Sequence, residues 1–195
     1  MDELLEQLKS KLDSGTISSI ASKIGADEGQ TSMAIQGALP TLLGAMSTNS
    51  QSKEGAQGLL SALDKDHDGS IFDDLGSHIN NFQNGSGSGI LKHVLGGNSA
   101  TVEQALGAKS GLNSSQSGQL MQILAPIVMG FLGKQKRSSA GGFDISQIAN
   151  LLGGMSKEAD KSTSLDLSDV LSVVGGLTGG GKSGGIGGLL GKLFK

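Results

Sequence analysis

Two stretches of the chain repeat the same pattern of glycine, glutamine and proline at an offset of 86 residues. When residues 23–44 are written above residues 109–130, no gap is needed. The identical pairs are Lys23/Lys109, Gly25/Gly111, Gln30/Gln116, Gln36/Gln122, Pro40/Pro126 and Gly44/Gly130. Chance seldom aligns so many residues of these types, so we infer a diverged internal duplication. A repeated unit constrains the architecture before any single element is assigned.

Each copy has the pattern of a short helix, a glycine turn and a long helix. The glycine suits the left-handed conformation that ends many helices. Asp27 and Asn113 stand at the N-cap position of the following helix, with a glutamine three residues later at capping-box spacing. Pro40 and Pro126 fall inside the long helices, where each removes a backbone hydrogen bond and predicts a kink.

These patterns predict an all-α fold. We place one compact domain at residues 1–137, with helix–turn–kinked-helix units at about 16–47 and 102–133. The segment from Leu120 to Leu132 has Gln122 as its one polar side chain. It is too short for the roughly 20 residues that cross a bilayer. We therefore expect a buried core helix there.

The composition changes beyond residue 137. Phe143–Met155 matches Leu165–Leu177 at an offset of 22 residues, and each stretch has apolar residues at helical spacing before a Gly-Gly pair. We expect two short amphipathic helical repeats within residues 138–177. Residues 178–195 are so rich in glycine that ordering their backbone costs more entropy than their few apolar side chains offset, which predicts a flexible tail.

Composition also excludes several classes of function. Because the chain has no cysteine, it cannot form a disulfide, a cysteine-ligated zinc site or a thiol nucleophile. A formal charge of −3 gives no electrostatic basis for binding nucleic acid or an anionic membrane. The first residues are acidic and lack the features of a secretory signal. We expect a cytoplasmic protein with no transmembrane segment and no nucleic-acid partner.

An aspartate-rich turn at residues 64–75 is similar to the calcium loop of an EF-hand. Three aspartates alternate at loop positions 1, 3 and 5, and a glycine follows at position 6. The metal ligands that we predict are Asp64, Asp66, Asp68, Ser70 and Asp74. Leu75 stands where an EF-hand has its bidentate glutamate, so we expect weak Ca²⁺ binding at most. The alternative is a turn whose carboxylates cap the next helix.

Two other patterns resemble functional motifs without the required context. Gly176–Ser183 satisfies the P-loop pattern, but it lies near the end of the sequence and has no later strand for a Walker-B acid. We expect no bound nucleotide. The paired helices also resemble a helix-turn-helix, yet the start of each long helix carries no Lys or Arg. No catalytic constellation is evident, so we expect a protein that is not an enzyme.

A family resemblance is carried by Gly89–Gly96, Val102–Gly111 and, most specifically, Leu120–Gly133. These segments resemble the bacterial YidB-like proteins, a family of unknown function, over about residues 1–136. The resemblance implies an all-α, cytoplasmic bacterial protein. It transfers no catalytic residues, because no activity is established for that family.

From the duplicated helices and the predicted tail we expect a non-enzymatic interaction or assembly protein. Its partner would be an unidentified protein or a second copy of the chain. One alternative is a calcium-responsive regulator that uses the turn at residues 64–75. The other is a helix-turn-helix-like DNA-binding protein.

Overall fold

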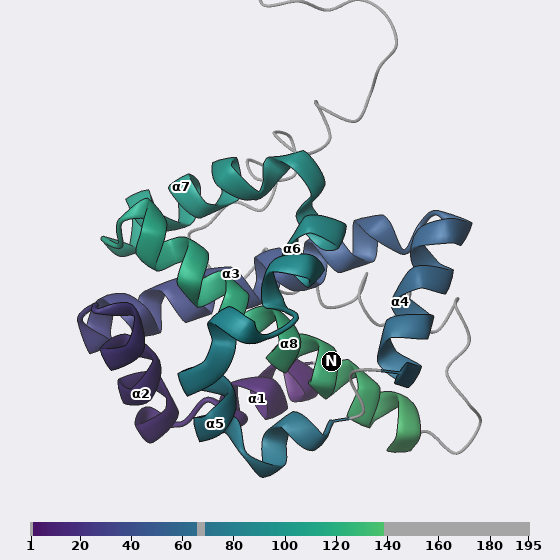
Figure 1. The fold of residues 1–195 in the computed structure, drawn as a ribbon, viewed down its shortest axis with the longest axis horizontal. Helices are drawn as coiled ribbons and strands as arrows, with labels where there is room; N and C mark the ends of the chain where they lie inside the picture. The colour runs from purple at the N-terminus through teal and green to yellow at the C-terminus, as the bar shows by residue number, and fades with distance from the viewer. Residues whose placement is uncertain (1, 66–68, 139–195) are drawn as a thin grey trace, which may run out of the picture.

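The computed structural model describes residues 2–65 and 69–138, and every regular element in these residues is helical (Figure 1). The α-helices are α1 (Asp2–Lys11), α2 (Ser14–Ile24), α3 (Glu28–Asn49), α4 (Lys53–Lys65), α5 (Leu75–Asn81), α6 (Gly87–Leu95), α7 (Ser99–Ser110) and α8 (Ser114–Ser138). Short 3-10 helices are η1 (Ser70–Asp73), η2 (Phe82–Asn84) and η3 (Gly96–Asn98). The predicted all-α fold is confirmed. The helical repeats predicted beyond Ser138 and the tail at 178–195 lie outside the described residues.

The centre of the domain is the crossing of α3 and α8. Figure 1 shows α8 running diagonally past α3, and α8 also packs against α2, α4, α6 and α7. From Leu120 to Leu132 every residue of α8 except Gln122 is buried. This confirms the predicted core helix. Burying each large aliphatic side chain contributes about 1.5–3 kcal/mol, and most residues of the core are of this kind.

Both long helices continue through a buried proline. Pro40 lies inside α3, and Pro126 lies at the equivalent place inside α8. Each proline removes one helical hydrogen bond at a cost of about 3 kcal/mol. Both prolines are buried, and the kinks at these positions stay a prediction.

The two glycine turns have the predicted geometry. Gly25 ends α2 with a φ of 66°, and Gly111 ends α7 with a φ of 80°, both in the left-handed region. Asp27 accepts two backbone amides of the first turn of α3 at 2.8 and 3.2 Å. Asn113 accepts the Gln116 amide at 2.9 Å, while its own amide donates to Gln116 Oε1 at 3.0 Å. The second turn therefore forms a complete capping box.

The two turns also pack against each other. Gln116 Nε2 donates to the Gly25 carbonyl at 2.6 Å, and in the reciprocal place the Gln30 side chain lies against Gly111. The helices are also paired reciprocally: the long helix α3 of the first unit packs against the short helix α7 of the second, and the long helix α8 packs against the short helix α2. The two units thus exchange equivalent contacts.

Candidate functional site

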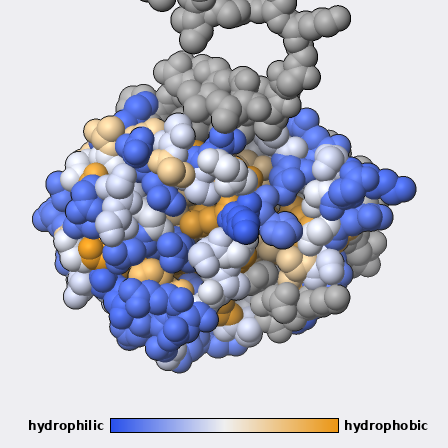
Figure 2. Space-filling view, turned by 45° about the horizontal axis from the view of Figure 1, so that its top comes forward, coloured by the Kyte–Doolittle hydropathy of each residue, from blue (hydrophilic) through white to orange (hydrophobic). Residues whose placement is uncertain are grey.

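A groove separates α4 from α6. Both helices pack against α8, and Met129 of α8 lies at the floor between them. The groove encloses about 900 Å³, near the upper end of the range for ligand pockets, roughly 300–1,000 Å³. Figure 2 shows that hydrophobic residues reach the surface of the domain in the middle of one face, with hydrophilic residues around them.

The walls of the groove combine aliphatic and very small residues. Its aliphatic members are Leu59 and Ala62 of α4, Ile90 and Val94 of α6, and Met129. Among the small residues, Gly58 and Gly89 are notable because a Cβ on either one would meet no atom within 4 Å. Because Gly58 and Gly89 have no side chains, there is room at these two positions for the backbone of another segment to approach closely.

The sequence of α4 explains why it forms one wall. Ala56 and Leu63 are buried on its core side. Gly55, Leu59 and Ala62 are spaced four and three residues apart, so they share a second face, which lines the groove. The apolar surface of α4 is thus wider than the core alone requires.

Local hydrogen bonds fix one end of the groove. Asn49, the last residue of α3, donates from Nδ2 to the His93 carbonyl of α6 at 3.2 Å. Ser52 Oγ accepts the Gly55 amide at 3.0 Å at the start of α4. A Cβ on Gly55 would lie 2.0 Å from the Asn49 carbonyl oxygen, so only glycine fits there. The rim carries the exposed polar side chains of Glu54 and His93.

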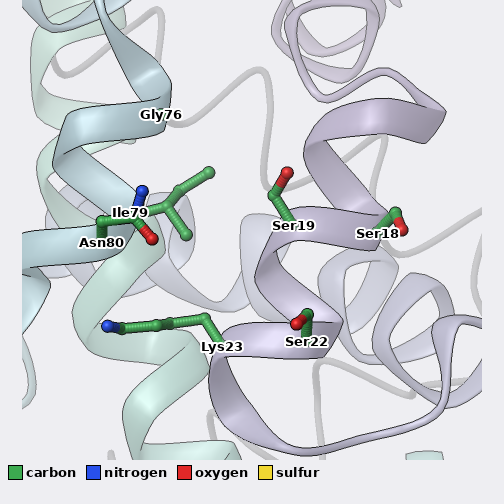
Figure 3. A pocket seen from close by; sticks show the side chains of 7 residues that line it. All are labelled: Ser18, Ser19, Ser22, Lys23, Gly76, Ile79 and Asn80. Carbon is green, nitrogen blue, oxygen red and sulfur yellow. The ribbon is translucent and has the colours of Figure 1, made fainter.

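A second hollow, of about 450 Å³, lies between α2 and α5. Figure 3 shows Lys23 reaching from α2 toward α5, where Asn80 lies, with Ser19 on the same side of α2. Its lining has hydroxyl, amide and ammonium groups and no carboxylate, which would suit an anion. However, Ser19, Lys23 and Asn80 are all exposed, so a ligand would compete with water for each contact. We regard the groove as the stronger candidate.

The predicted calcium ligands are only partly within the described residues. Asp66 and Asp68 lie outside them. Asp64 forms an ion pair with Lys136 near the end of α8, so the carboxylate at loop position 1 already has a cationic partner. Within residues 2–65 and 69–138, no group of three or more His, Asp or Glu side chains is arranged to hold a metal ion.

The other two predicted ligands begin helices. Ser70 is the first residue of η1. Asp74 caps α5, where its carboxylate accepts the Ser77 amide at 2.9 Å. This hydrogen bond lowers the pKa of Asp74. Asp74 thus has the capping role that the alternative interpretation of the turn predicts, and Ca²⁺ binding stays a prediction.

The end of the acidic turn is packed on α8. Gly130 of α8 faces η1 so closely that a Cβ on it would lie 2.5 Å from Ile71 Cγ2. Gly69 approaches the same part of α8, since its own Cβ would lie 2.9 Å from Lys134 Cβ. Together with the Asp64–Lys136 pair, these contacts hold the described parts of the turn against the last turns of α8.

Part of the surface that a helix-turn-helix would use to read DNA is taken up by contacts within the domain, although Glu28, Ser114 and Ser115 stay exposed. Gln30 lies against Gly111, and Gln116 donates to the Gly25 carbonyl. Thr31, also at the start of α3, is fully buried. Polar side chains that a recognition helix would direct at base edges therefore hold the two turns together.

Sequence reasoning did not identify the groove. The available signal was the excess of apolar and small residues in α4, which is more than one core-facing stripe needs. That the second face borders an open space depends on where α6 lies, and sequence spacing does not give this. The predicted P-loop, Gly176–Ser183, lies outside the described residues.

Fold and groove together define an all-α domain with an apolar groove between two of its shorter helices. The chain belongs to a family described as bacterial protein of unknown function (DUF937), whose model matches residues 6–135. This confirms the predicted family resemblance. No match was found among curated proteins or among solved structures. In the part of the chain that the structure describes, none of the helices combines the length and apolarity that spanning a membrane requires.

Proposed function

We propose that this protein acts by binding rather than by catalysis, and that the α4–α6 groove receives an apolar helical segment of a polypeptide. The observation that carries the proposal is the groove itself. It has an aliphatic floor, glycines in both walls and a volume of about 900 Å³.

The shape of the groove favours a helix over a small molecule. Its α4 wall extends from Gly55 to Ala62, and at 1.5 Å per residue this is about 10 Å, or two helical turns. A helix that carries apolar residues at positions i, i+3, i+4 and i+7 presents a stripe of that length. The open space at Gly58 and Gly89 allows its backbone to come close.

The lining also favours an occupant with few charges. Leu59, Ile90 and Val94 are half-buried aliphatic side chains that already pack on the core. Covering them removes further apolar surface from water, at about 25 cal/mol per Å². Glu54 and His93 lie on the rim, where polar groups of an amphipathic helix would stay solvated.

Site-specific photo-cross-linking in bacterial cells tests this proposal. A benzophenone amino acid replaces Ser88, on the exposed rim, in the full chain, and a matched control carries it at Ser22 in the α2–α5 hollow. We expect adducts from Ser88 that map to an apolar segment with helical periodicity, and no such adducts from Ser22. Equal adducts from both positions, or none from Ser88, would overturn the proposal.

Two glycine variants test whether the cross-links from Ser88 depend on an open groove. Gly58→Phe places a large side chain in the groove, and the Cβ that it adds meets no atom of the domain within 4 Å. Gly97→Phe adds the same side chain at an equally open position that does not line the groove. We expect the adducts from Ser88 to disappear in Gly58→Phe and to persist in Gly97→Phe.

A further inference from the structure

We propose that the groove is occupied by residues 143–155 of the same chain, docked intramolecularly as a short amphipathic helix. This inference rests on the proposed function and deepens it by naming the segment that binds. Three observations support it: where the described chain ends, which side chains the segment carries, and how long the connection is.

The described chain ends beside the last turn of α4, the helix that forms one wall of the groove. α8 ends at Ser138, and Lys136 pairs with Asp64 of α4. Asp64 follows Ala62 of the groove wall by two residues, about 3 Å along the helix axis. The connection from Ser138 to Ile145 is seven residues and spans up to about 24 Å. That length passes around α4, whose diameter is about 10–12 Å.

The segment matches the groove in pattern and charge. Ile145, Ile148, Ala149 and Leu152 stand at positions i, i+3, i+4 and i+7, which places them on one face of a helix two turns long. That is the length of the α4 wall. Asp144 is the single charged residue between 143 and 155, and it precedes the apolar stripe. No charge therefore has to enter the aliphatic part of the groove.

The second copy of this pattern, Leu165–Leu177, is the weaker competitor. It carries two acidic residues, Asp166 and Asp169. It also begins 22 residues further along the chain, and effective concentration falls with roughly the −3/2 power of linker length. The shorter connection and the lower charge both favour residues 143–155.

Intramolecular docking has a consequence for partners. A short tether gives an effective concentration on the order of millimolar, so even a weak contact is substantially formed in the free chain. Any other polypeptide that binds the groove must then displace residues 143–155.

Engineered disulfides test this placement, because the natural chain has no cysteine. In a docked helix Ser146 flanks the apolar stripe, whereas Gln147 lies on the opposite face. We compare two full-length double variants, Ser88→Cys with Ser146→Cys and Ser88→Cys with Gln147→Cys, under mild oxidation on a non-reducing gel. We expect the Ser146 pair to form an intramolecular disulfide several-fold faster than the Gln147 pair.

Two further substitutions test whether the disulfide forms because the segment docks in the groove, and not through random collisions of a tethered segment. Ile148→Asp places a charge in the stripe, and Gly58→Phe fills the groove. Each should bring the Ser146 pair down to the rate of the Gln147 pair, while Gly97→Phe should leave it unchanged. Far-UV circular dichroism of every variant verifies that the helical domain is folded.

Equal rates for the two pairs, or disulfides formed only between two chains, would overturn the inference. The latter result would give the groove to a second copy. If the intramolecular disulfide fails but cross-links from Ser88 map to an apolar helix of another polypeptide, the proposed function stands and this inference falls. If both experiments fail, both proposals fall.

Discussion

From the close contact between Gly130 and Ile71 we predict that packing against α8 fixes the position of the acidic turn. A Cβ on Gly130 would lie 2.5 Å from Ile71 Cγ2, much closer than normal van der Waals contact. Glycine to alanine in a helix interior normally stabilises by about 0.5–1 kcal/mol. Overpacking a filled site costs about 1–3 kcal/mol. We therefore expect Gly130→Ala to be destabilising by roughly 0.5–2 kcal/mol after the helix gain is subtracted.

Urea unfolding of the full chain, followed by far-UV circular dichroism, measures this difference. Gly58→Ala is the matched control, because its added methyl group meets open space and should stabilise by about 0.5–1 kcal/mol. In an Ile71→Ala background the clash with Cγ2 is gone, so Gly130→Ala should become neutral or stabilising. An equal loss in both backgrounds would refute the packing of the turn on α8 as the cause.

Three other predictions concern charged groups. Lys136→Ala frees Asp64 from its ion pair, so we expect tighter Ca²⁺ binding than in the natural chain; calorimetry that shows no heat for either protein at millimolar Ca²⁺ would contradict a calcium site. Burial raises the pKa of Glu103, which means that folding disfavours its charged form. Glu103→Gln should therefore raise the melting temperature at pH 7, with the gain shrinking as the pH falls through the raised pKa; a gain that is independent of pH would count against this cause. The Ser77 amide lowers the pKa of Asp74, so its capping is fully present above the ordinary carboxyl pKa of about 3.9 and is lost as the pH falls through the lowered value. The difference in melting temperature between Asp74→Ala and the natural chain should vanish in acid, and a constant difference would argue against capping by the carboxylate.

Local rules explain why much of the fold could be predicted. The end of α2 at Gly25 and the start of α8 at Asn113 depend on residues within one turn, and so do the caps. The buried stripe of α8 follows from its apolar residues, since between residues 120 and 132 only Gln122 is not buried. The structure has a short helix, a glycine turn and a long helix at both of the predicted places.

Long-range contacts explain what the sequence left open. Asp64 and Lys136 are 72 residues apart, and Gln116 is 91 residues from the carbonyl that it binds at Gly25. No spacing rule predicts such pairs. The short helices α5 and α6, of seven and nine residues, contain too few turns for a clear periodicity. Since α6 forms one wall of the groove, the candidate site could not be located before the fold was known.

The most direct measurement uses the methyl group of Met129 at the groove floor. Met129 lines the groove and is 2% exposed, so an occupant that fills the groove covers the small part of its side chain that is still accessible. In the full chain we expect nuclear Overhauser contacts between the Met129 methyl group and the side chain of Ile148, absent in Gly58→Phe. Contacts from Met129 only to residues of the described domain, unchanged by Ile148→Asp, would contradict the central claim that this groove holds residues 143–155.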